Sequence, residues 1–81
     1  MRDLVEYLAK ALVEYPEQVQ VSQREDESTI IIELRVASED MGKVIGKQGR
    51  IAKAIRSLVK ASAGPDERKR IAVDIMSLDE V

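Results

Sequence analysis

Residues 42–61 read GKVIGKQGRIAKAIRSLVKA, and this stretch decides the fold. Its second half has the spacing of an amphipathic helix, because apolar side chains share one arc at about 100° per residue: Ile51, Ala52, Ile55, Leu58 and Val59. Just upstream, Ser38 followed by two acids predicts the N-cap and first turn of a short helix. Gly46 and Gly49 lie between the two helices, where they mark a bend or a close approach of the backbone. We therefore predict a helix–turn–helix unit over residues 38–62.

The flanking segments add one helix and three strands. Residues 1–16 predict a helix with Asp3 as N-cap, Glu6 completing a variant of the capping box, and Pro16 as the stop signal. Residues 18–36 alternate apolar and polar side chains around a short charged turn, which predicts an antiparallel hairpin. Residues 70–76 alternate in the same way and predict a last strand. The expected inward side chains are Leu4, Val5, Leu8 and Leu12 on the helix, Val19, Val21, Ile30, Ile32, Leu34 and Val36 on the hairpin, and Ile71, Val73 and Ile75 on the last strand.

The resulting order, α-β-β-α-α-β, predicts an α+β fold. A helical crossover between strands is normally right-handed and returns parallel, so the third strand should lie parallel to the second. We expect a mixed three-stranded sheet with the helices packed on one face. A chain of 81 residues has no room for a second core, so residues 1–81 should form a single domain.

The composition excludes several classes of function. The chain has no cysteine and no histidine, which excludes disulfides, thiolate or imidazole metal sites and nucleophile–histidine catalysis. Acidic residues are plentiful, but they fall on charged faces and turns with no apolar pocket to tune them, so we do not expect an enzyme or a cofactor. No stretch reaches the length of a membrane span and no signal peptide is visible, so we expect a cytoplasmic protein.

The charge is strongly uneven along the chain. The net charge is −2, yet residues 41–63 contain no acid and six cations, which leaves −8 on the rest: Lys43, Lys47, Arg50, Lys53, Arg56 and Lys60. Such polarity in a small domain indicates a cationic face with an anionic partner.

The glycine pair lies where this cationic segment meets a helix N-terminus. The first N–H groups of a helix lack internal partners and carry partial positive charge. Lys47 and Arg50 project beside them, and Arg50 and Lys53 oppose the helix dipole without an acid to offset them. We therefore predict a phosphate site at residues 46–50.

Two other interpretations of the glycines deserve comparison. Gly46 could be a helix C-cap and Gly49 a packing glycine, with the lysines merely solvated. A nucleotide-binding P-loop needs four residues between its glycines and a Ser or Thr after its Lys. Here three residues separate Gly42 from Gly46, and Gln48 follows Lys47, so the P-loop is excluded.

With its Ile-Gly-x-x-Gly core and the apolar positions that follow, the stretch resembles the KH domain signature. The order of elements resembles the type II arrangement, and the resemblance covers roughly residues 1–76. In the family, the GxxG loop clamps the backbone of about four nucleotides of single-stranded RNA. The resemblance implies that Gly46, Lys47, Gln48 and Gly49 contact RNA, with Lys43, Arg50 and Lys53 bordering the site. The loop at residues 64–70 corresponds to the family's variable loop, which makes Arg68, Lys69 and Arg70 second-rank candidates.

The resemblance also implies a role and partners. We expect a single-stranded RNA-binding protein that acts as a post-transcriptional regulator or RNA chaperone, forms a homodimer, and pairs with a larger KH-containing protein. The two aromatic residues, Tyr7 and Tyr15, lie on the first helix, so bases would rest on aliphatic surface and sequence preference would be weak. The alternative is a dimerisation or adaptor module that acts through protein contacts. Whether the protein recovers RNA separates the two.

Overall fold

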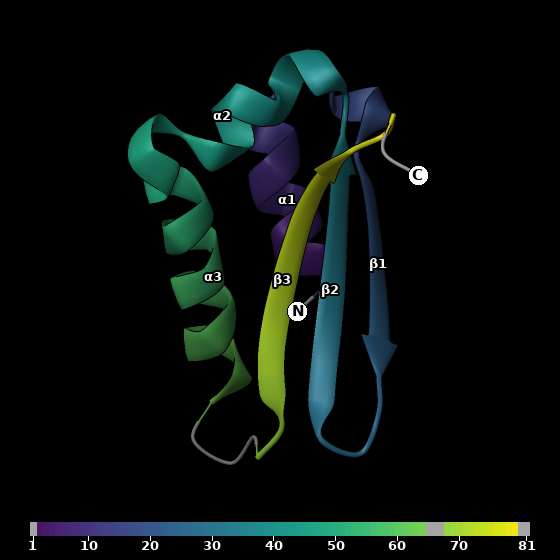
Figure 1. The fold of residues 1–81 in the computed structure, drawn as a ribbon, viewed down its shortest axis with the longest axis vertical. Coiled ribbons are helices and arrows are strands. Elements are labelled where there is room, and N and C mark those ends of the chain that lie inside the picture. Colours follow the sequence, from purple (N-terminus) through teal and green to yellow (C-terminus); the bar gives the residue numbers. More distant parts are fainter. Residues whose placement is uncertain (1, 65–67, 80–81) are drawn as a thin grey trace.

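The computed structural model describes residues 2–64 and 68–79. It contains three helices, α1 (Arg2–Leu12), α2 (Met41–Ile45) and α3 (Arg50–Ala63), and three strands, β1 (Gln20–Glu25), β2 (Thr29–Val36) and β3 (Arg70–Ser77). Single 3-10 turns lie at Pro16–Gln18, Ser38–Asp40 and Lys47–Gly49. The sheet forms one layer, with α1 behind it and α3 alongside β3 (Figure 1). This confirms the predicted α-β-β-α-α-β order and the α+β fold with helices on one face.

The sheet has the predicted mixed topology. Its order is β1-β2-β3, with β1 antiparallel to β2 and β3 parallel to β2. Ile32 pairs with Gln23 on one side and with Val73 on the other. The central strand is therefore β2, which explains why it has the most regular apolar alternation.

The core lies between the sheet and the helices. Ile30, Ile32, Leu34 and Val36 are all buried, as their alternation predicts. They form one core with Val73 of the neighbouring strand β3 and with side chains from the three helices: Val5, Ala9, Val44, Ile55 and Val59. The predicted apolar arcs are too wide, because Leu12 is 38% exposed and Leu58 is 48% exposed. α3 packs through the narrower arc of Ala52, Ile55 and Val59, which leaves Leu58 at its margin.

The first helix is shorter than the predicted span of residues 1–16. It ends at Leu12, and the buried carboxylate of Asp40 accepts hydrogen bonds from the next free backbone N–H groups. Glu14 N donates to Oδ1 at 3.0 Å and Tyr15 N donates to Oδ2 at 3.0 Å. A buried carboxylate is stable only when it is hydrogen-bonded, and these two donors satisfy it. By binding the backbone of Glu14 and Tyr15, Asp40 stabilises a non-helical conformation there, so α1 ends at Leu12 and not at Pro16.

The predicted N-caps are also wrong. Ser38 Oγ donates to Glu39 Oε1 at 2.9 Å, and α2 begins at Met41 after a 3-10 turn without a side-chain cap. Asp3 lies inside α1, where its carboxylate contacts the Arg2 guanidinium at 3.3 Å. Glu6 does not complete a capping box either, because its Oε1 lies between Arg2 Nη2 at 3.7 Å and Lys10 Nζ at 3.8 Å. Neither Ser38 nor Asp3 therefore caps its helix, and Asp40 instead accepts hydrogen bonds from the backbone beyond α1.

The β1–β2 turn is closed by Asp26. Its Oδ1 accepts hydrogen bonds from Ser28 N at 2.8 Å and from Thr29 N at 2.7 Å. These two backbone hydrogen bonds hold the pKa of Asp26 below its usual value. The ionised carboxylate of Asp26 thus stabilises the predicted charged turn.

Candidate functional site

The turn between α2 and α3 is the most unusual piece of backbone in the described residues. Gly46, Gln48 and Gly49 have positive φ angles of 77°, 58° and 75°. Gly49 N donates to Gly46 O at 3.2 Å and closes a single 3-10 turn. Only a short, tightly wound segment with glycines at its ends can reverse the chain here, since most L-residues avoid positive φ.

The two glycines serve different purposes. A Cβ on Gly46 would lie 2.6 Å from Ile51 Cγ1, so this glycine caps α2 and lets α3 pack closely. A Cβ on Gly49 would meet no protein atom within 4 Å. Gly46 is therefore the helix C-cap that the alternative interpretation of the glycines predicts, whereas Gly49 is not a packing glycine. Gly49 leaves the backbone at the start of α3 open to solvent.

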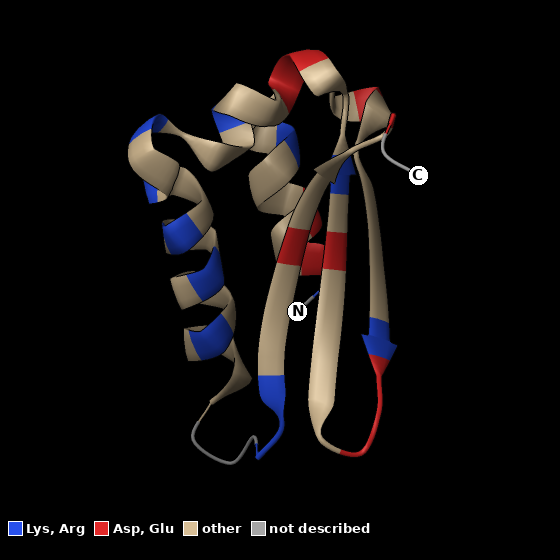
Figure 2. Cartoon of the chain, viewed as in Figure 1, with Lys and Arg blue, Asp and Glu red and all other residues tan. Residues whose placement is uncertain are grey.

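Cations surround this open backbone. We define the cationic strip as the five basic residues on the loop and along α3: Lys47, Arg50, Lys53, Arg56 and Lys60. All five are exposed, and Figure 2 shows the basic positions of α3 repeating along its outer side. The side chains of four of them, all except Arg56, make no hydrogen bond or ion pair to any residue in 2–64 or 68–79. Gln48, the other tip residue, is also exposed. Their charge is thus available to an external anion.

Lys43 differs from the other expected site residues. Its Nζ lies 3.3 Å from Glu14 Oε2 and 3.7 Å from Asp40 Oδ1. Glu14 lies just beyond α1, so Lys43 ties the start of α2 to the end of the first helix. Its charge is partly neutralised within the protein, unlike that of Lys47, Arg50 and Lys53.

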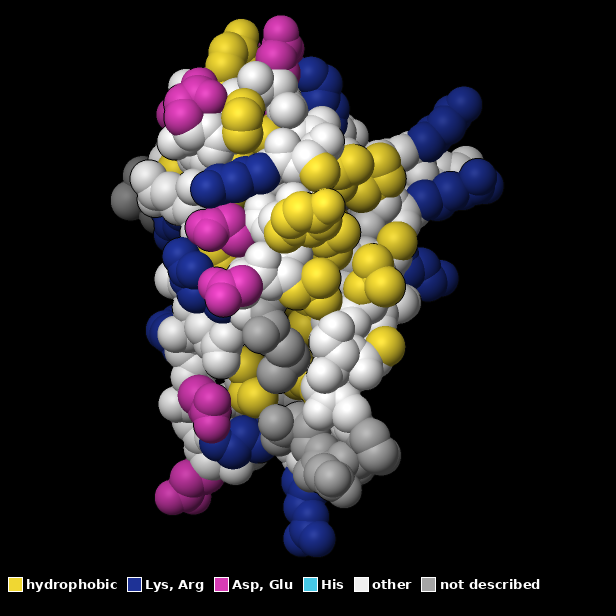
Figure 3. Space-filling model, turned by 180° about the vertical axis from the view of Figure 1, so that it is seen from behind, with side chains coloured by type: hydrophobic (Ala, Val, Ile, Leu, Met, Phe, Trp, Pro, Cys, Tyr) yellow, Lys and Arg dark blue, Asp and Glu magenta, His cyan; other side chains and the backbone are white. Residues whose placement is uncertain are grey.

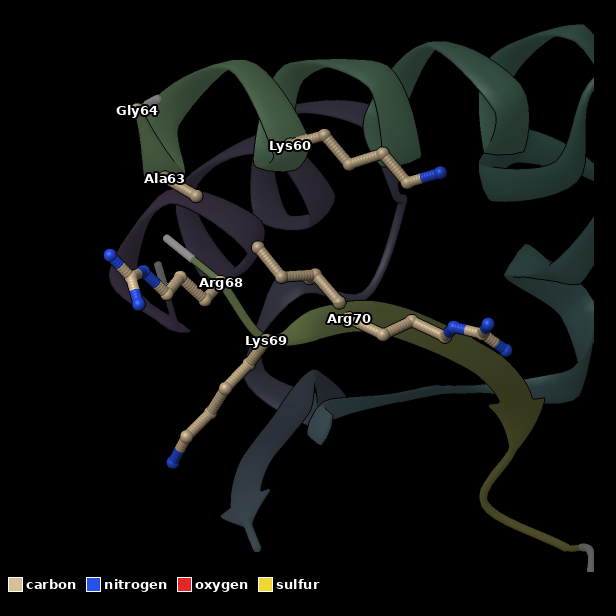
Figure 4. Close-up of a pocket in the computed structure, with 7 residues that line it drawn as sticks. Lys60, Ala63, Gly64, Arg68, Lys69 and Arg70 are labelled. Atoms are coloured by element: carbon tan, nitrogen blue, oxygen red, sulfur yellow. The ribbon is translucent and has the colours of Figure 1, made fainter. Parts of the chain in front are cut away.

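The second-rank candidates flank a cavity of about 400 Å³ at the far end of α3. Its lining comes from the end of α3 and the start of β3: Lys60, Ala63, Gly64, Arg68, Lys69, Arg70 and Ile71. Lys60 and Arg70 extend in the same direction, whereas Arg68 points to the opposite side (Figure 4). Lys69 turns toward β1 and lies 2.6 Å from Glu25 Oε2. Residues 65–67 of this loop lie outside the described part of the chain.

Arg56 is the residue that sequence reasoning left out of the site. Its Nε donates to Val73 O at 3.2 Å, which joins the middle of α3 to the edge of β3. The spacing of Lys53, Arg56 and Lys60 places the three on one helical face, and this was the available signal. The bond to β3 depends on residues 17 positions apart, which no local pattern reveals.

No helix within residues 2–64 and 68–79 is long and apolar enough to cross a membrane. Apolar side chains gather instead on the helical face of the molecule, beside the edge from which Lys and Arg side chains project (Figure 3). Tyr7, 72% exposed, belongs to α1 and is not part of the glycine turn.

This order of elements, with a glycine turn between two helices packed on a mixed sheet, is that of a type II KH domain. The family model "KhpA/KhpB, KH domain" matches residues 2–75, and the chain belongs to that family. The identification of a KH domain is thereby confirmed.

Curated relatives support the same assignment. "RNA-binding protein KhpA" of Clostridium acetobutylicum is 59% identical over 76 residues, which cover 94% of this chain and 100% of that protein. The protein of the same name in Aquifex aeolicus is 46% identical over 94% of this chain and 95% of that protein.

The solved structures agree on the fold alone. Era, crystallised with MgGDPNP and nucleotides of 16S ribosomal RNA, is 16% identical, with a TM-score of 0.61. The match covers 94% of this chain but only 29% of the Era chain.

Proposed function

We propose that the protein binds single-stranded RNA and holds its phosphate backbone at residues 46–49. The observation that carries the proposal is the unoccupied space at Gly49 beside the unpaired side chains of Lys47 and Arg50. Relatives that share more than half of the sequence are named RNA-binding proteins, which favours the same ligand.

The proposed binding mechanism is electrostatic. A phosphate at the turn is attracted by the positive end of the α3 dipole, and Gly49 lets it approach the backbone because no side chain covers that position. Lys47 and Arg50 neutralise it, and Lys53 neutralises a neighbouring phosphate one helical turn further along. Lys43 contributes less, because Glu14 and Asp40 already share its charge. The site needs no metal, cofactor or catalytic group, and we expect no enzymatic activity.

The wider role follows from the family. We place the protein in the cytoplasm, as an RNA chaperone or post-transcriptional regulator that contacts many RNAs. We also propose a homodimer and pairing with KhpB, the other protein in the family's name. The exposed apolar side chains of Tyr7 and Leu58, together with half-buried Ile31 on the open sheet face, favour self-association.

The same exposed side chains favour the second candidate function, an adaptor that acts only through protein contacts. Sedimentation over a wide concentration range should show a dimer, and a monomer at every concentration would contradict self-association. The adaptor differs from the leading proposal in recovering no RNA.

Fluorescence anisotropy with a labelled single-stranded RNA tests the leading proposal. Log K should fall against log[salt] with a slope of about −0.7 per neutralised phosphate, so two to four contacts give roughly −1.4 to −2.8. Absence of binding at low salt would favour the adaptor. Binding with a slope near zero would exclude a phosphate clamp.

A further inference from the structure

The outer edge of β3 offers unpaired backbone groups beside the cationic strip. Arg70 N and Leu78 N donate to β2 and its flank, at Ser28 O and Val36 O, both at 2.9 Å. The N–H and C=O groups of successive strand residues point to opposite edges of the strand. In β3, those of the even-numbered residues therefore point toward β2. Odd-numbered residues, Ile71, Val73 and Ile75, therefore direct their N–H and C=O groups to the open edge that lies next to α3.

Arg56 alters this edge at its midpoint. By donating Nε to Val73 O it occupies the carbonyl acceptor that the strand would otherwise present. The two terminal nitrogens, Nη1 and Nη2, have no partner among the described residues. Among the described residues no acid, Asp74 next to Val73 included, forms an ion pair with Arg56. Arg56 therefore exchanges an acceptor for a pair of donors held in a planar fork.

The position of Arg56 is also suited to RNA. On α3, Lys53 lies one turn before Arg56, on the side of the glycine loop. Lys60 lies one turn after Arg56, on the side of the cavity that Lys60 and Arg70 line. A strand whose phosphates follow Lys47, Lys53 and Lys60 passes over Arg56 with its bases toward β3. The Arg56–Val73 bond fixes the guanidinium, so little side-chain freedom remains to be lost on binding.

We propose that Arg56 is a specificity-determining residue that selects guanine at the β3 edge of the RNA site. This inference rests on the proposed RNA-binding function. It adds a preference at one nucleotide to an otherwise electrostatic interaction.

The choice of guanine follows from the donor pair. Guanine offers two adjacent acceptors, O6 and N7, which match the arginine fork. Adenine replaces O6 with an amino donor that faces the guanidinium unfavourably, and uracil has an N–H beside its O4. Cytosine offers N3 and O2, but its amino donor lies directly beside N3. Guanine is therefore the base with the best match.

Four eight-nucleotide RNAs test the proposal: oligouridine, and the same chain with one central G, A or C. Discrimination of a bidentate arginine–guanine contact corresponds to about 5- to 150-fold, and the exposure of Arg56 favours the lower part, about 5- to 30-fold. Arg56→Lys keeps the charge but loses the fork, so the ratio of its affinity for the G chain to its affinity for oligouridine should fall toward one. Its circular dichroism and melting temperature verify folding. As a matched control, Lys60→Gln should weaken all four RNAs by a similar factor.

The outcomes separate this inference from the function on which it rests. Failure of the parent to bind any of the four RNAs would refute the proposed function. Equal binding of all four, tighter binding of the A or C chain than of the G chain, or an Arg56→Lys variant that still prefers G would overturn the role of Arg56 alone.

Discussion

Gly46→Ala should destabilise the protein much more than Gly49→Ala, although the two glycines belong to one motif and share a positive φ. Gly46 has φ 77° and ψ 176°, a region that is essentially restricted to glycine, and its Cβ would lie 2.6 Å from Ile51 Cγ1. Gly49 has φ 75° and ψ 14°, in the left-handed helical region, with no protein atom near its Cβ.

The magnitudes follow from these environments. Backbone strain at Gly46 costs about 1–3 kcal/mol and overpacking against Ile51 about 1–3 more, which gives roughly 2–6 kcal/mol. At Gly49 only the left-handed backbone contributes, about 1–2 kcal/mol. A chain of 81 residues has a free energy of unfolding of about 4–12 kcal/mol, so the first substitution removes a large part of it.

Thermal denaturation followed by circular dichroism measures the difference. Each kcal/mol lowers Tm by about 4–8 °C in a domain of this size, so Gly46→Ala should melt at least about 8 °C below the parent. Gly49→Asn is the matched control, because asparagine tolerates left-handed backbone, and it should melt closer to the parent than Gly49→Ala. If Gly46→Ala melted as high as Gly49→Ala, the packing role assigned to Gly46 would be wrong.

Three further substitutions follow from the described contacts. Asp40→Ala leaves two part-buried N–H groups without their acceptor and should lower the free energy of unfolding by up to about 1–3 kcal/mol per group in a urea titration. Asp26→Ala should destabilise at neutral pH. Since the pKa of Asp26 is lowered in the folded protein, its contribution is present above the unfolded pKa and is lost as pH falls through the folded pKa. The difference in Tm between parent and variant should therefore vanish in acid, and a difference independent of pH would contradict the ionised turn. Lys43→Gln should weaken RNA binding less than Arg50→Gln in anisotropy titrations. The reverse order would show that the pairing with Glu14 does not reduce the contribution of Lys43 to binding.

The sequence was sufficient to predict the fold because the fold depends on local patterns. The alternation at Ile30, Ile32, Leu34 and Val36 could only belong to a central strand, and handedness then fixed the direction of β3. The exposed turn at residues 46–49 followed from two glycines between amphipathic segments.

The parts that sequence could not supply depend on distant pairs. The sequence predicts Asp40 as an acid in the first turn of a helix, yet it binds backbone 25 and 26 residues away and ends α1. Lys43 belongs to the acid-free segment, yet its partner Glu14 lies 29 residues earlier. The link from Arg56 to Val73 likewise depends on how α3 lies against β3. Each involves a charged side chain whose partner is chosen by the packing of elements, which periodicity does not encode.

The central claim is that the glycine turn binds the phosphate backbone, and the double variant Lys47→Asp, Gln48→Asp tests it most directly. Both side chains are exposed, aspartate tolerates the positive φ of Gln48, and acids are favourable near a helix N-terminus, so the fold should persist. Lys10→Asp, Gln18→Asp is the control with the same change in charge on exposed positions away from the turn, and because it also removes the contact of Lys10 with Glu6, its melting temperature is measured too. Anisotropy titration of both variants with one single-stranded RNA is the deciding measurement. We expect the loop variant to keep its melting temperature but lose RNA binding, while the control still binds. A loop variant that binds RNA as tightly as the control would contradict it.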